Sequence, residues 1–234
     1  MGRVIAARES LVTISSDGAP ITKNEVGYVL VGDQRLKAEV LRIRGHTADM
    51  QVFEDTSGCR VGDKVELTGE LLSVELGPGI LGSVFDGLQN PLHGLAEQNG
   101  FFLPRGVYLD PLDRRKKWRF NATASIGDLV SAGMPLGNVS EGKQCHKIMV
   151  PFNEPEDLEV SWIREGNYTV DEPVARLRRS GGEEIEVTLI QRWPVRIPIP
   201  ARMFARNQAE RLFPYEPMTT TTRIIDTFFP IARG

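Results

Sequence analysis

Residues 72–92 read LSVELGPGILGSVFDGLQNPL, and this stretch separates two parts of the chain that are rich in short apolar runs. Glycine and proline alternate with apolar residues in Leu76–Gly82, which predicts a turn, because glycine adopts backbone conformations that other residues avoid. Ser83–Gln89 then predicts a short helix ended by Gly87, and Pro91–Gln98 predicts another turn or two of helix. We therefore expect a connector with short helices over residues 71–110.

The residues before this connector, 1–70, predict a small all-β unit. Short apolar runs rich in β-branched residues recur there, and turn formers such as Gly32-Asp33 and Arg44-Gly45 separate them. About six strands at this spacing indicate a barrel or a sandwich, in which few strand edges stay unpaired. The runs are Val4–Ala6, Leu11–Ile14, Val26–Val31, Ala38–Ile43 and Met50–Phe53.

The residues after the connector, 111–190, return to a β pattern. Ile126–Gly137 and Arg164–Val174 echo each other, since each places a turn glycine and an acidic residue ahead of a short apolar strand. Two such halves predict a flattened sandwich of short strands, like that of lipoyl and biotinyl domains. The acidic, proline-containing segment Asn153–Asp157 predicts an exposed loop.

The last stretch, 191–234, is rich in proline and predicts the start of a further domain. Thr222–Pro230 is expected to form a short helix that Pro230 ends. Ile231–Gly234 after it has the character of an element that is interrupted.

Composition restricts the class of protein. The net charge of -3 argues against a dedicated nucleic-acid binder. The basic run Arg114–Arg119 is the candidate for nucleic-acid binding, with Trp118 as a platform on which a base could stack. Such a run is more typical of a solvent-exposed strand or loop edge. Cys59 and Cys145 are too few for a disulfide framework and are expected to be reduced thiols.

We expect contact with a membrane only through partners. The N-terminal residues lack a long apolar run, so we expect no signal peptide. Leu71–Leu81 is too short and too interrupted to span a bilayer.

The motif that comes nearest to known chemistry is Gly137-x4-Gly142-Lys143-Gln144. It misses a phosphate-binding P-loop because Gln144 replaces the Ser or Thr whose hydroxyl coordinates magnesium. A P-loop also opens a helix, whereas Cys145–Pro151 predicts a strand ended by proline. Phosphate binding is therefore not expected here.

Lysine modification and metal binding are the other candidate chemistries. Lipoyl and biotinyl domains carry a modified lysine at a tight turn, and Lys143 and Lys147 are the candidates, although neither has the usual flanking residues. His46, His93 and His146 are widely separated, and Cys145-His146 alone cannot supply a zinc site. We therefore assign no catalytic, cofactor-binding or metal-binding residue.

Two segments resemble the catalytic A subunits of V/A-type rotary ATPases. Leu72–Leu92 resembles the segment that joins the β-barrel of those subunits to their nucleotide-binding domain. Trp193–Arg196, followed by Arg223–Pro230, resembles the start of that domain. The resemblance covers essentially the whole chain. It implies a six-stranded barrel at residues 1–69 and, at 111–190, the barrel-sandwich insertion (the "bulge") that marks A subunits.

The resemblance implies a role in rotary catalysis. A and B subunits of the family alternate in a hexamer, where ATP hydrolysis or synthesis is coupled to proton or sodium transport through a membrane sector. It implies ATP and Mg²⁺ as cofactors of the full-length subunit, and B and peripheral-stalk subunits as partners. It also implies a cytoplasmic location, peripheral to the membrane.

The family's P-loop lysine and catalytic glutamate have no counterpart in these 234 residues. We therefore expect this chain to have no ATPase activity by itself. A standalone binding or carrier module and a regulatory paralogue are the alternatives.

Two departures from the family pattern stand out. Thr220–Arg223 occupies the position of a Thr-Gly-Gln-Arg sequence, so that a β-branched residue, Thr221, replaces a glycine. Thr221 is expected to disfavour a positive φ. Phe152–Asp157 replaces a glycine-rich turn of the insertion.

Overall fold

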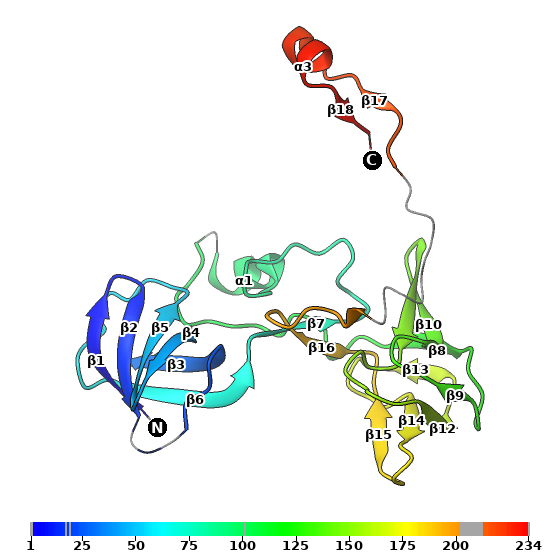
Figure 1. The fold of residues 1–234 in the computed structure, drawn as a ribbon, viewed down its shortest axis with the longest axis horizontal. Coiled ribbons are helices and arrows are strands. Elements are labelled where there is room, and N and C mark those ends of the chain that lie inside the picture. Colours follow the sequence, from blue (N-terminus) through cyan, green and yellow to red (C-terminus); the bar gives the residue numbers. More distant parts are fainter. Residues whose placement is uncertain (1, 17, 19, 101, 202–212, 234) are drawn as a thin grey trace. The chain divides into compact units, whose positions relative to one another are not determined.

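The computed structural model describes residues 2–16, 18, 20–100, 102–201 and 213–233. The chain divides into two compact units, Met1–Pro198 and Ile199–Gly234. Strands dominate the described part of the first unit, which confirms the predicted mainly β fold (Figure 1). None of the helices within the described ranges is long and apolar enough to cross a membrane.

The first six strands close into a barrel, as predicted. Their order around the barrel is β1-β2-β5-β4-β3-β6, and all neighbours pair antiparallel. The five apolar runs found in the sequence supply β1 to β5. The strands are β1 Gly2–Arg8, β2 Leu11–Ser16, β3 Glu25–Val31, β4 Gln34–Arg44, β5 Thr47–Val52 and β6 Lys64–Leu71.

The barrel core consists of the side chains that point inward from these strands. In β2, Val12 and Ile14 are fully buried while the residues between and around them are partly or fully exposed. In β5, Ala48, Met50 and Val52 alternate in the same way. Because successive strand residues face opposite sides, this alternation fixes the register of the barrel.

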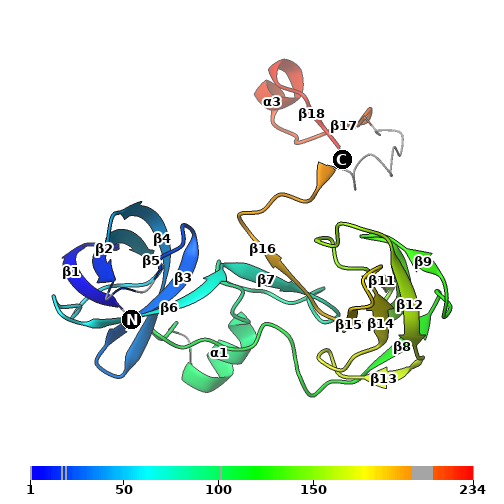
Figure 2. The same ribbon diagram turned by 60° about the horizontal axis from the view of Figure 1, so that its bottom comes forward.

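Two four-stranded sheets form the sandwich that the sequence predicts after the connector. Their orders are β11-β10-β8-β13 and β15-β14-β12-β9. Figure 2 shows both sheets side by side. The strands are β8 Trp118–Ala122, β9 Leu129–Val130, β10 Pro135–Glu141, β11 Gln144–Met149, β12 Leu158–Ile163, β13 Gly166–Tyr168, β14 Ala175–Arg178 and β15 Glu184–Val187.

The sandwich core is centred on Phe120, which is fully buried between the sheets. Gly137 on the neighbouring strand β10 makes room for its ring, because a Cβ at Gly137 would lie 2.5 Å from the Asn121 carbonyl oxygen and closer still to the ring. Leu136, Leu158 and Leu177 complete the centre of this core.

The connector differs in part from its prediction. The helix α1, Leu92–Asn99, lies where Pro91–Gln98 predicted one. The helix predicted for Ser83–Gln89 is wrong, because this segment forms a turn in which Asp86 Oδ1 accepts hydrogen bonds from the backbone N–H groups of Leu88 and Asn90, both 2.8 Å long. An aspartate that bonds the backbone ahead of it favours a turn over a helix.

The strand β7, Ser73–Leu76, pairs antiparallel with β16, Gln191–Pro194, which follows the sandwich in the chain. The connector and the segment after the sandwich therefore form one small sheet.

The loop expected at Asn153–Asp157 is present, and its residues are exposed as predicted, except for Glu154. Glu154 is only 4% exposed, and Arg179 forms hydrogen bonds with its carboxylate at 3.0 and 3.1 Å. A buried carboxylate must be paired, and this pairing draws the loop onto the sandwich.

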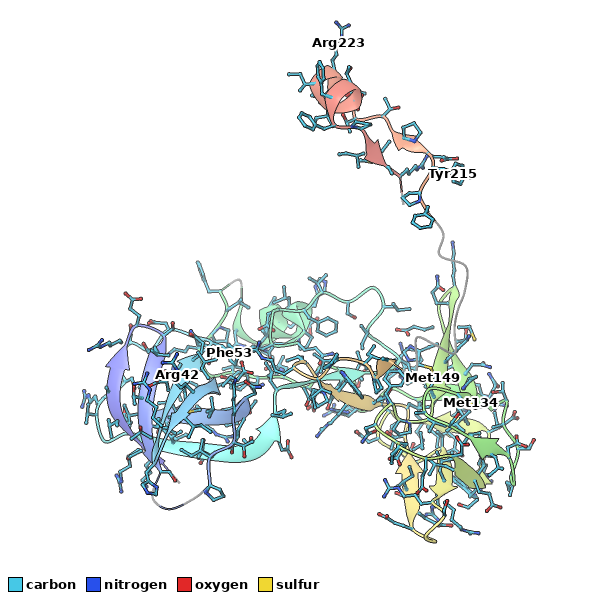
Figure 3. The ribbon with its side chains drawn as sticks, in the orientation of Figure 1. Arg42, Phe53, Met134, Met149, Tyr215 and Arg223 are labelled. Carbon is cyan, nitrogen blue, oxygen red and sulfur yellow. The ribbon has the colours of Figure 1, made fainter. Side chains whose placement is uncertain are left out.

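The second unit contains the predicted helix. α3 spans Arg223–Phe228, and β17 Pro217–Met218 pairs antiparallel with β18 Ile231–Ala232. Thr221, just before the helix, has a φ of 66°. This is the left-handed conformation, which a β-branched residue such as threonine disfavours. Figure 3 labels Tyr215 and Arg223 in this unit.

We predict that Gly137→Ala destabilises the sandwich by about 1–3 kcal/mol, because the added methyl group collides with Phe120 and with the Asn121 backbone. Urea unfolding measures the change. Gly181→Ala is the matched control: nothing lies within 4 Å of a Cβ there, and its cost should stay within about 0.5 kcal/mol. Equal stability of the two variants would contradict the packing argument.

We predict that Thr221→Gly stabilises the turn before α3. Relief of the left-handed strain is worth about 1–2 kcal/mol, partly offset by the greater backbone freedom of glycine in the unfolded chain. Hydrogen exchange at the Asp226 and Phe229 amides, which close the helix turns, should slow by about two- to fivefold. Thr222→Gly, at a φ of -96°, should speed exchange instead. Unchanged or faster exchange in Thr221→Gly would refute the strain.

Candidate functional site

The connector is fastened to the barrel through Glu54 and Tyr108. The Tyr108 hydroxyl donates to Glu54 Oε2 over 2.5 Å and accepts from the Lys37 backbone N–H over 2.7 Å. The other Glu54 oxygen accepts from the Gly106 N–H over 2.8 Å. Arg105 adds hydrogen bonds to Gln34 and to the backbone oxygens of the loop after β5. Residues 105–108 are thereby held against β4 and this loop.

Burial changes the acid–base properties of this contact. It raises the pKa of Tyr108, and the hydrogen bond to Glu54 raises it further. Burial lowers the pKa of Lys37, although the negative charges of Asp86 and Glu54 partly oppose the shift. The Lys37 ammonium lies 4.8 Å from the centre of the Tyr108 ring. This arrangement keeps the phenol neutral and hydrogen-bonded, which suits a structural contact.

Glu75 on β7 binds two arginines. Arg114 Nη2 lies 2.5 Å from Oε2, and Arg192 Nη2 lies 2.9 Å from Oε1. Arg114 continues to Asp171 in the sandwich, with Nη1 2.9 Å from its Oδ1. The Glu75 side chain is only 10% exposed, so the two cations compensate a carboxylate that has lost most of its water. This network joins β7, β16 and the sandwich.

Glu39 on β4 binds Arg196, just after β16. Arg196 Nε donates to Oε1 over 2.8 Å and Nη2 donates to Oε2 over 2.6 Å, which is the parallel two-bond geometry that arginine forms with carboxylates. The Glu39 side chain is 1% exposed, and the pairing raises the pKa of Arg196. The barrel thus holds the segment that leaves the β7–β16 sheet.

Glu141 in the sandwich holds the Gly77–Gly82 turn. Its Oε1 accepts hydrogen bonds from the Gly79 N–H at 2.6 Å and from the Leu81 N–H at 3.1 Å. Its Oε2 lies 3.2 Å from His146 Nδ1. The glycine turn that opens the connector is therefore anchored on the sandwich by a buried carboxylate.

Gln89 supports β7 from its free side. Its side-chain oxygen accepts from the Glu75 N–H over 2.7 Å, and its side-chain nitrogen donates to the Glu75 carbonyl over 2.6 Å. The amide thereby imitates one residue of a neighbouring strand. It satisfies backbone groups that a strand edge would leave unpaired.

The arrangement as a whole suits positioning. Glu39, Glu75 and Glu141 are buried, and each accepts hydrogen bonds from arginine or backbone donors. Across the described residues, no three His, Cys, Asp or Glu side chains gather in a way that could hold a metal ion. The connector therefore joins barrel and sandwich through fixed charge pairs.

The P-loop-like segment Gly137–Gln144 lies in the hairpin of β10 and β11. Gln144 pairs with Glu141 across a two-residue turn in which Gly142 has a φ of 62°. No helix follows this turn, so the segment lacks the ring of backbone N–H donors that cradles phosphates. These residues do not fit an ATP–magnesium site. Lys143 is exposed at the turn, and Lys147 is exposed on β11.

The other singled-out residues are scattered. Trp118 is 8% exposed and carries the Lys116 ammonium 3.9 Å from its ring centre, so the ring cannot stack on a base. Cys59 is half-buried, and burial raises the pKa of its thiol, while Cys145 is exposed. Of the histidines, His146 contacts Glu141; His46 and His93 lie on the hairpin after β4 and on α1.

Sequence reasoning missed the buried glutamates. Glu39 lies within the apolar run that predicts β4, and Glu75 lies within LSVEL. A lone charge inside an apolar strand was the available signal, since such a residue needs a partner when buried. The identity of the partner could not be read, because Arg196 is 157 positions away from Glu39.

Comparison with known families places both β domains. Residues 11–69 match the beta-barrel domain of the ATP synthase alpha/beta family. Residues 109–196 match the ATP synthase alpha/beta subunit barrel-sandwich domain. Together these matches cover more than half of the chain.

Similar proteins include several spirochaete sequences. The chain is 50% identical over 234 residues to the V-type ATP synthase alpha chain of Borrelia hermsii, covering 100% of this chain and 39% of the relative. It is 50% identical to V-type ATP synthase alpha chain 1 of Treponema pallidum, covering 38% of it, and 49% identical to the V-type ATP synthase alpha chain of Treponema denticola, again covering 38%. The chain thus spans about two fifths of the length of these curated relatives.

The two domain matches and the identity along all 234 residues show that this chain belongs to the ATP synthase alpha/beta family, where it corresponds to the N-terminal portion of V-type ATP synthase alpha chains.

Proposed function

We propose that the chain serves as the N-terminal part of the catalytic A subunit of a V/A-type ATPase, where it contributes to assembly of the A/B hexamer. The observation that carries this proposal is the 50% identity to V-type ATP synthase alpha chains over the full 234 residues. In the complete complex, ATP hydrolysis or synthesis is coupled to proton or sodium transport. ATP and Mg²⁺ act in the complete subunit, outside the residues described above.

We assign separate tasks to the four segments. The barrel, 1–70, joins the neighbouring B subunits, and the sandwich, 111–190, faces outward toward peripheral-stalk subunits. Residues 71–110 connect the two, and 191–234 begin the nucleotide-binding domain. The complex keeps this chain in the cytoplasm at the membrane periphery.

The charge pairs of the connector support this division. A subunit that transmits force between its domains needs a rigid connection between them. The Glu75–Arg114–Asp171 and Glu39–Arg196 contacts tie β7, β16, the barrel and the sandwich by bonds of 2.5–2.9 Å. Buried pairs of this kind are costly to break singly.

A carrier module is the second candidate, because Lys143 is exposed at a tight hairpin turn of a barrel-sandwich domain. Intact-mass analysis of the protein purified from its source separates the two functions. A lipoyl or biotinyl adduct on Lys143 favours the carrier, and the mass of the unmodified sequence favours the ATPase subunit.

We predict that residues 1–234 function in place of the matching N-terminal portion of the Treponema denticola V-type ATP synthase alpha chain. The chimera, produced with the other V-type subunits of that organism, should copurify with them. Its rate of ATP hydrolysis should lie within about tenfold of the parent rate, which corresponds to ~1.4 kcal/mol in the activation free energy of the rate-limiting step.

The control is the same alpha chain without its N-terminal portion, which should not enter the complex. A chimera that is folded by circular dichroism, yet stays outside the complex, would overturn the proposed function.

A further inference from the structure

The strand β11 leaves one edge of its sheet unpaired by any other strand in the described structure, because the sheet order is β11-β10-β8-β13. Gln144 and Glu141 flank the two-residue turn, so their backbone groups bond each other. Hydrogen-bonded and non-bonded pairs alternate along an antiparallel ladder. The N–H and C=O groups of Cys145 and Lys147 therefore point away from β10, toward the open edge.

A cavity of about 200 Å³ runs along this edge. Four successive β11 residues, His146–Met149, line it. Successive side chains of a strand point to opposite faces, so a cavity that touches four in a row follows the edge of the strand. Met149, labelled in Figure 3, lies at the end of β11.

The opposite wall of the cavity is mainly apolar. It comes from Leu76 at the end of β7 and from the segment Val187–Gln191 that joins β15 to β16. Pro151 and Phe152 close one side. An apolar wall beside unpaired backbone groups is the combination that binds an extended peptide, whose backbone pairs with the edge while a side chain fills the pocket.

Gln191 supplies a further donor. Its Nε2 atom is buried and has no hydrogen-bond partner among the described residues. Buried donors without a partner are rare in folded proteins. A carbonyl oxygen of an incoming backbone fits this donor.

The charges beside the edge select the partner. Lys143 and Lys147 are exposed along it. Glu141, two positions before Lys143 in the same hairpin, is buried and already bound to His146 and to the connector turn. The open charges are therefore positive, and they complement acidic residues on an incoming strand.

We propose that the β11 edge and its cavity bind an extended polypeptide segment of a partner protein, with one small apolar residue in the cavity and acidic residues on both sides. The segment adds to the sheet as a fifth strand next to β11. This inference does not rest on the proposed function.

Titration of the 15N-labelled chain with the peptide acetyl-EDTVTDE-amide tests the proposal. The backbone amide signals of Cys145 and Lys147 and the side-chain amide of Gln191 should shift, with a dissociation constant of about 1 mM or tighter. Hydrogen exchange at the Cys145 and Lys147 amides should slow. The same peptide with N-methyl groups on its three central residues should bind at least about tenfold more weakly, because its backbone donors are gone.

Protein variants separate the contributions. Gln191→Leu should weaken binding by several-fold, whereas Gln98→Leu on the exposed face of α1 should not. Acetyl-KKTVTKK-amide should bind more weakly than the acidic peptide, and the difference should shrink in high salt. Absence of shifts at Cys145 and Lys147 up to about 10 mM peptide, or equal binding of the N-methylated peptide, would overturn the proposal.

Discussion

The structure depends on a few glutamates that are buried in a β-rich chain. A carboxylate taken out of water must be paired, and leaving it unpaired costs several kcal/mol. Glu75 meets this demand with Arg114 and Arg192, Glu39 with Arg196, and Glu141 with the backbone of the glycine turn. Each of these partners belongs to a different segment of the chain from its glutamate. The same contacts that satisfy the charges therefore hold the connector and the β7–β16 sheet in place.

This arrangement explains how two separate β domains can act as one part of a larger subunit. The barrel and the sandwich each have their own apolar core, centred on residues such as Met50 and Phe120. The sandwich core reaches the connector at Ile80. The other links of the connector are polar: Tyr108 and Glu54 on the barrel, Gln89 along β7, and Glu75 toward the sandwich. Such directional bonds fix geometry more strictly than apolar packing does. That property suits the proposed place of this chain in a rotary ATPase.

The sequence predicted the elements whose cause is local and missed those whose cause is distant. Short apolar runs between turn formers located β1 to β5, and a proline located the end of α3, because both signals act within a few residues. The helix predicted at Ser83–Gln89 is wrong because the Asp86 carboxylate accepts hydrogen bonds from the backbone ahead of it and so stabilises a turn. The acidic, proline-containing loop at 153–157 is exposed as predicted, but the burial of Glu154 within it could not be predicted, because its partner, Arg179, lies 25 positions away. The buried glutamates were missed for the same reason. Thr221 has a left-handed φ at the position where the resemblance places a glycine, so there the sequence pointed to the right residue without giving its conformation.

A double-mutant cycle between Glu75 and Arg114 tests most directly whether charge pairing holds the connector. Glu75→Gln, Arg114→Gln and the double variant would be compared by urea unfolding, with the exposed pair Arg35–Glu66 as the reference cycle. The account predicts a coupling free energy of about 2 kcal/mol for Glu75–Arg114 and below about 1 kcal/mol for the exposed pair. A coupling for Glu75–Arg114 no larger than that of Arg35–Glu66 would contradict it.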